Sequence, residues 1–166
     1  MLPKAEIHCH IEGAASPALV RAQAARYGVD VSAILSADDG YIWSDFTQFL
    51  HAYDLAASLF RTRDDYALLA RTYLDELAGQ GAIYSEFFIS IDHARSAGLD
   101  PAAYIEGLAD GIEQARAASG IEARMIATGL RHEGPAAVEA VAAWHAGNAH
   151  PLITGFGMAG DERMFA

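Results

Sequence analysis

Two histidines stand one residue apart near the start of the chain, in the segment KAEIHCHIEG at positions 4–13. In a β-strand, alternate side chains point to opposite faces of the sheet. We therefore expect His8 and His10 to share a polar face with Lys4 and Glu6. The opposite face would be small and apolar and would pack under helices; it consists of Ala5, Ile7, Cys9 and Ile11. Two adjacent imidazoles can supply part of a zinc site, although catalytic zinc needs a third ligand and an open position for water.

The spacing alone leaves a second interpretation open, in which the pair are hydrogen-bonded polar residues at a strand end, because H-x-H is short and common. The context favours a metal, since Glu12 and Gly13 follow the strand at once. Cys9 lies on the apolar face and is expected to be a buried small hydrophobe, not a nucleophile. Because it is the only cysteine, the P-C-x-x-C motif of cytidine-type zinc deaminases is excluded, although H-I-E matches their H-x-E opening.

The composition indicates one globular domain in the cytoplasm. The chain has 166 residues, 52% of them hydrophobic and 20% charged, which is enough to bury a core. A formal net charge of −11 argues against nucleic acid or an anionic membrane surface as a partner. A single cysteine indicates a reducing compartment, and the sequence has neither a secretory signal nor an apolar run long enough to span a membrane.

Helical and strand-like segments alternate along the chain. Capping residues, prolines and glycines predict helices at 16–28, 45–60, 64–81, 100–120 and 134–147. Segments rich in β-branched and aromatic residues predict strands at 4–11, 82–90, 122–132 and 151–159. This order predicts βαβ units in a parallel α/β sheet, with right-handed crossovers placing the helices outside. No linker divides the chain, and 28–44 is its least regular part.

Four such units could form a small open sheet or the first half of a (β/α)8 barrel. In both folds, ligands bind at the C-terminal ends of the strands. Three polar segments lie at such ends, namely His8 with His10, Arg131 with His132, and GMAGDE at 157–162.

The segments LPKAEIHCHIEGAASP and GFGMAGDE resemble two motifs of the adenosine deaminase family, which are metal-dependent purine aminohydrolases. AIYSEFFIS and GIEARMIATGLRHEG occupy the places of that family's second and third strands. The resemblance therefore covers essentially the whole chain in order. It implies a (β/α)8 TIM-type barrel, a Zn²⁺ ion, and hydrolytic loss of the 6-amino group of a purine by attack of zinc-activated water.

Four positions match residues that have a role in the family. His8 and His10 match the first two zinc ligands. Gly160 matches a glycine whose backbone contacts the purine ring, and Glu12 matches an acidic residue on the ribose side of the substrate. The helix predicted at 45–60 could be plain core, and the resemblance implies that it also walls the nucleoside pocket.

The family takes its other site residues from the fifth to eighth strands: a third histidine ligand, an aspartate ligand, the glutamate of an HAGE-like motif and a further histidine. The letters HAG at 145–147 precede Asn148 and end a predicted helix, so they do not supply that glutamate. Asp161 and Glu162 fit helix capping as well as catalysis. The resemblance implies that residues 1–166 are the N-terminal part of one barrel domain. We expect them to be inactive alone, with the general acid/base beyond Ala166, and to associate through open sheet edges.

Three functions follow from these expectations. The leading one is zinc-dependent deamination of adenosine to inosine in purine salvage, with a purine nucleoside as the small-molecule partner. An alternative is deamination of adenine or a modified nucleoside, because adenine-specific members usually have glutamate at the position of Glu12 and adenosine-specific ones aspartate. The AGDE motif at 159–162 favours adenosine. A third possibility, from another class, is a truncated purine-binding relative without catalysis.

Overall fold

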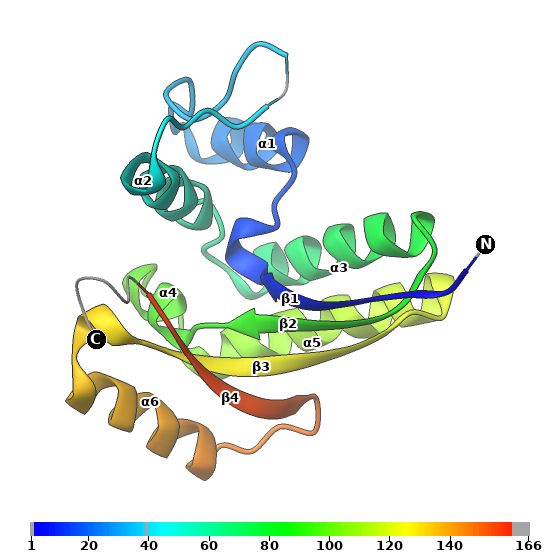
Figure 1. Ribbon diagram of the computed structural model, residues 1–166, viewed down its shortest axis with the longest axis vertical. Coiled ribbons are helices and arrows are strands. Elements are labelled where there is room, and N and C mark those ends of the chain that lie inside the picture. The colour runs from blue at the N-terminus through cyan, green and yellow to red at the C-terminus, as the bar shows by residue number, and fades with distance from the viewer. Residues whose placement is uncertain (1, 39, 161–166) are drawn as a thin grey trace.

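A computed structural model describes residues 2–38 and 40–160 and contains one four-stranded sheet (Figure 1). Its strands lie side by side in chain order; they are β1 (Lys4–His10), β2 (Ala82–Ile89), β3 (Glu122–Leu130) and β4 (Ile153–Ala159). All neighbouring strands are parallel. The structure therefore confirms the predicted α/β class at nearly the predicted strand bounds.

Three helices connect successive strands, as the alternating pattern predicts. They are α3 (Arg63–Gly79), α5 (Pro101–Ser119) and α6 (Pro135–Gly147). Helices α3 and α5 lie together behind the sheet (Figure 1). Their backbones approach closely, because a Cβ atom built on Gly111 of α5 would lie 2.5 Å from the carbonyl oxygen of Ala67 in α3. Glycine is therefore required where these two helices cross.

Two further helices lie between β1 and α3 in the chain, above the C-terminal end of β1 (Figure 1). They are α1 (Pro17–Tyr27) and α2 (Phe46–Ala57). Both begin at the predicted caps, because Ser16 accepts from the backbone N–H of Leu19 and Asp45 accepts from that of Gln48. Between them, the segment predicted to be irregular contains one isolated antiparallel bridge, from Leu35 to Tyr41, within its described residues.

The hydrophobic core lies between the sheet and helices α3 and α5. Large fully buried members are Phe87, Ile89, Leu69, Leu74, Leu108 and Ile112. The strands at the two sheet edges are less covered, since Ile7 of β1 is 61% exposed and Met158 of β4 is 53% exposed. No helix in the described part of the chain is both long and apolar enough to cross a bilayer.

The strict alternation expected for β1 is wrong. Glu6 pairs with Ser85 and Cys9 with Phe87, so β1 advances three residues while β2 advances two. This one-residue bulge places Glu6 opposite the buried Ser85, on the helix-covered side, and no longer with the histidines. Ile7, expected in the core, is exposed.

Three short elements after the strands were not predicted. They are the 3₁₀ turn η1 (Ile11–Gly13), the helix α4 (Ile91–Ser96) and the 3₁₀ turn η2 (Arg131–Glu133). Each follows the C-terminal end of a strand, where a barrel fold builds its site.

Candidate active site

His8 and His10 lie together on the face of the sheet opposite the core. Their ring centroids are 6.0 Å apart, and Phe88 of β2 contacts both rings, at 5.0 Å from His8 and 4.9 Å from His10. His10 pairs with Phe88 across the β1–β2 ladder, which fixes their common face. The structure therefore places the two imidazoles as neighbours, despite the bulge that precedes them.

The chemistry of this pair fits part of a metal site. Burial lowers the pKa of His10, and the neighbouring His8 and His93 lower it further, against the opposing effect of the Glu12 carboxylate. The neutral imidazole favoured in this way is the form that binds a metal ion. Within residues 2–38 and 40–160, however, no group of three or more histidine, cysteine, aspartate or glutamate side chains could hold a metal.

Glu12 is buried in η1, immediately after the histidine strand, and is only 1% exposed. Its Oε2 accepts a hydrogen bond of 3.1 Å from the hydroxyl of Tyr53. Its Oε1 accepts from the Tyr104 hydroxyl and, at 3.3 Å, from the backbone N–H of Ser90. This one carboxylate therefore connects the turn after β1 to α2, α5 and the end of β2.

Gly13 allows Tyr53 to lie against this turn. A Cβ atom at Gly13 would stand 2.5 Å from Cε2 of Tyr53, so any larger residue would displace the tyrosine ring. On its other side, the Tyr53 ring is 5.6 Å from the ring of His93 in α4. Tyr53 thus lies between the Glu12 turn and α4.

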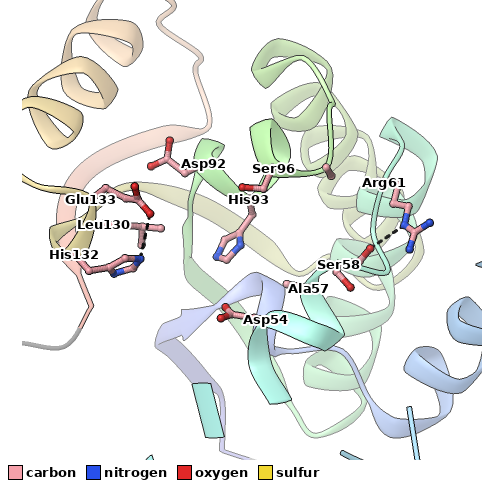
Figure 2. A pocket seen from close by; sticks show the side chains of 11 residues that line it. Asp54, Ala57, Ser58, Arg61, Asp92, His93, Ser96, Leu130, His132 and Glu133 are labelled. Carbon is pink, nitrogen blue, oxygen red and sulfur yellow. Dashed lines mark hydrogen bonds and ion pairs between the residues drawn. The ribbon is translucent and has the colours of Figure 1, made fainter. Parts of the chain in front are cut away.

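A cavity of about 590 Å³ opens at this end of the sheet, and its lining side chains converge from α2, α4 and η2 (Figure 2). Its polar lining includes Asp54 of α2, His93 of α4, and His132 of η2. A volume of this size is typical of small-molecule sites. His93 also contributes to the lowered pKa of His10, although neither His8 nor His10 is one of the residues that line the cavity.

Gly160 follows β4 with a φ of 116°, a conformation that favours glycine. A Cβ atom there would lie 3.0 Å from Nδ1 of His132 and 2.9 Å from Cγ of Arg131. The structure therefore brings Gly160 beside η2 and the cavity lining, as expected for neighbouring strand ends. Asp161 and Glu162 lie outside the described residues.

Sequence reasoning missed several residues at this site, namely Tyr53, Phe88, His93 and Tyr104. His93 follows a predicted strand directly, so its position at a strand end could have identified it. Tyr53 lies in the helix predicted at 45–60, which the resemblance places at the pocket wall, and Tyr104 lies in the helix predicted at 100–120. Nothing in their spacing shows that both hydroxyls reach the same carboxylate.

A parallel βα sheet with a cavity at the C-terminal ends of its strands fits both folds expected from the sequence, the open sheet and the half barrel. The comparison with protein families is more specific, because the adenosine deaminase model matches residues 3–166. The chain belongs to this family, and the predicted resemblance and barrel fold are confirmed.

Curated relatives and solved structures match nearly all of the chain. An adenine deaminase from Chelativorans sp. is 68% identical over 98% of the chain and 50% of its own length. The crystal structure of an adenine deaminase from Arthrobacter aurescens superposes with a TM-score of 0.84 at 23% identity, covering 99% of this chain and 51% of the other. An amidohydrolase from Burkholderia ambifaria with bound zinc has the same TM-score at 24% identity, covering 99% and 46%. The chain thus spans about half the length of the relatives it matches.

Proposed function

We propose that the full-length protein containing this chain is a zinc-dependent adenine deaminase, which replaces the 6-amino group of adenine with oxygen and releases ammonia. The observation that carries this proposal is the 68% identity to a relative named adenine deaminase over 98% of the chain. The family alone would also fit the adenosine deamination expected first from the sequence. The relative's name favours the alternative substrate, adenine.

His8 and His10 would provide two ligands of the zinc ion, and residues outside the described part would complete the site. The zinc ion would lower the pKa of a water molecule and so supply the nucleophile at neutral pH. The support from this chain is the pair of adjacent imidazoles near the C-terminal end of β1, the end of the sheet at which the cavity opens. The bound zinc in the Burkholderia amidohydrolase supports the same metal.

Glu12 supports a free base as the substrate over a nucleoside. A residue that binds ribose hydroxyls needs a carboxylate that faces the ligand, whereas both oxygens of Glu12 accept from protein donors and the side chain is 1% exposed. Gly160, beside the cavity lining, could bring its backbone to the purine ring, as the resemblance implies.

The test is a substrate panel with the purified full-length protein. Loss of the amino group is followed by ultraviolet absorbance on adenine, adenosine and an N6-substituted adenine, and zinc is measured by elemental analysis. We expect kcat/KM to be highest for adenine, with zinc bound. Preference for adenosine would overturn the substrate assignment, and zinc binding without turnover of any purine would favour the non-catalytic alternative.

A further inference from the structure

Tyr104 lies in the first turn of α5, is fully buried, and is not one of the residues that line the cavity. Its hydroxyl donates to Oε1 of Glu12. The same hydroxyl accepts from the backbone N–H of Ser90, at 3.1 Å, where β2 ends. One hydroxyl therefore joins the crossover helix α5 to two strand ends of the candidate site.

The carboxylate extends this connection to the cavity. Oε2 of Glu12 accepts from Tyr53 at 3.1 Å, and Tyr53 belongs to α2, the helix that also contributes Asp54 and Ala57 to the cavity lining. The Tyr53 ring lies between Gly13 and His93, so it has little room to adopt another position. The contacts Tyr104–Glu12–Tyr53 thus run from the back of the sheet to the α2 wall.

Charge explains why these contacts hold their geometry. Burial raises the pKa of both Tyr53 and Tyr104, and the nearby Glu12 carboxylate raises it further, so both tyrosines keep the proton they donate. A hydrogen bond to a buried carboxylate is stronger than one between neutral groups.

A neighbouring tyrosine provides a contrast. Tyr66 is equally buried, and its ring packs edge-to-face on that of Tyr104 with the ring centroids 4.5 Å apart. Its hydroxyl, however, has no hydrogen-bond partner among the described residues.

We propose that Tyr104 is a positioning residue, which orients the Glu12 carboxylate and, through it, holds Tyr53 and the α2 wall of the purine cavity. The inference rests on the proposed function only for the identity of the purine that the cavity binds. Because Tyr104 contacts Glu12 and does not itself line the cavity, its effect should fall on purine binding more than on the chemical step.

The experiment compares Tyr104→Phe with Tyr66→Phe in the full-length protein. Both substitutions remove one buried hydroxyl and keep the ring. We expect Tyr104→Phe to raise KM for adenine by about tenfold with kcat within about threefold, because uniform binding is lost, whereas Tyr66→Phe leaves KM unchanged. Zinc content should be the same in both variants.

A second variant makes the test specific to the connected contacts. Tyr53→Phe should also raise KM, and the Tyr53→Phe/Tyr104→Phe double variant should raise it no further than the larger single effect, because both act through one carboxylate. Multiplicative effects would show that the two tyrosines act separately and would overturn the proposal. Tyr53→Phe also keeps the test decisive if Tyr104→Phe yields little folded protein.

Two outcomes separate this inference from the proposed function. If Tyr104→Phe lowers Tm but leaves KM at the parent value, Tyr104 is structural only and the inference fails while the function stands. If the parent deaminates only adenosine, or binds a purine without turnover, the proposed function fails. The same variants then decide the positioning role through KM or Kd for the purine that the parent does bind.

Discussion

The ring of Phe88 stacks on that of His10, with centroids 4.9 Å apart and 20° between the ring planes. It also contacts His8 at 5.0 Å. Behind it, a Cβ atom at Gly157 of β4 would approach Cε1 of Phe88 to 3.2 Å. Phe88 is therefore held between β1 and β4 and restricts the rotamers of both imidazoles.

Replacing Phe88 should therefore weaken metal binding without removing a ligand. In the full-length protein, we expect Phe88→Ala to lower zinc affinity by about tenfold, the lower end of effects seen when groups supporting metal ligands are changed. The measurement is competition with a chelator. Phe156→Ala is the control, because Phe156 is an aromatic residue of β4 that is 46% exposed. Equal affinities in both variants would contradict the role of Phe88.

The zinc assignment itself is tested by removing the imidazoles. His8→Ala and His10→Ala in the full-length protein should each lose most of the bound zinc, measured by elemental analysis, because two adjacent ligands of one ion are removed in turn. His51→Ala serves as the matched control, since His51 is exposed on α2 and should keep full zinc content. Unchanged zinc in His8→Ala and His10→Ala, with secondary structure intact, would rule the pair out as ligands.

The parts of the fold that could be predicted are those that depend on local sequence. Ser16, Asp45 and Asp100 cap the helices that follow them, and Gly28 and Gly120 end helices with positive φ. These signals are complete within a few residues, so the helix and strand order followed from them. The histidine pair was found for the same reason.

The parts of the fold and of the site that could not be predicted depend on pairing between distant segments of the chain. The bulge in β1 arises from its register with β2, about which the β1 sequence carries no information. Helix α4 has only six residues, too few to show a helical period. Glu12 and Tyr104 are separated by 92 positions, and only the parallel arrangement of the βα units brings their side chains together. Sequence spacing therefore located the strand-end histidines but not the contacts that support them.

Asp65 should be a main determinant of stability in acid. Its carboxylate has no exposed side-chain surface and binds Gln23, Arg26 and Tyr27 of α1, which joins α1 to the start of α3. Burial alone would raise its pKa, but hydrogen bonds from Tyr27 and Gln23, together with those from residues 61 and 62, outweigh it and hold the pKa below that of an ordinary aspartate.

Because the folded-state pKa is lowered, this stabilisation is fully present above the ordinary aspartate pKa and is lost as pH falls through the lowered value. We expect Asp65→Asn to reduce the free energy of unfolding at pH 7 by about 3 kcal/mol, because several hydrogen bonds to a buried charged acceptor are lost or weakened, each worth about 1.5–3 kcal/mol. The difference from the parent should shrink below pH ~4 in urea titrations. Asp75→Asn removes an exposed i,i+4 pair with Arg71 and should cost less than about 0.5 kcal/mol. Equal losses of unfolding free energy in Asp65→Asn and Asp75→Asn would contradict the role of Asp65 as a main determinant of stability.

The close crossing of α3 and α5 gives a separate test of packing. Gly111→Ala should destabilise the protein by about 2 kcal/mol, because the added methyl group meets the backbone of α3. Gly79→Ala is the matched control at the end of α3, where a Cβ atom meets nothing within 4 Å. It should be neutral or stabilise by up to about 1 kcal/mol, since alanine is the better helix former. The measurement is the free energy of unfolding in a chemical denaturant. An unchanged value for Gly111→Ala would show that α3 and α5 can move apart without loss of stability.

The open edges of the sheet predict self-association of the 166-residue chain expressed alone. Within the described residues, β1 pairs only with β2 and β4 only with β3, so each presents an unpaired backbone edge. Apolar side chains accompany the β4 edge, where Phe156 is 46% and Met158 is 53% exposed. Such edges pair with other chains unless they are covered or carry charge.

Light scattering should therefore give a mass above that of the monomer, and Phe156→Lys with Met158→Lys should shift it towards the monomer. Leu68→Lys is the matched control, because Leu68 is 42% exposed on α3 and belongs to neither edge strand, and it should leave association unchanged. A monomeric parent chain would contradict the prediction. An equal response to the α3 substitution would show that association arises from general surface hydrophobicity and not from the strand edge.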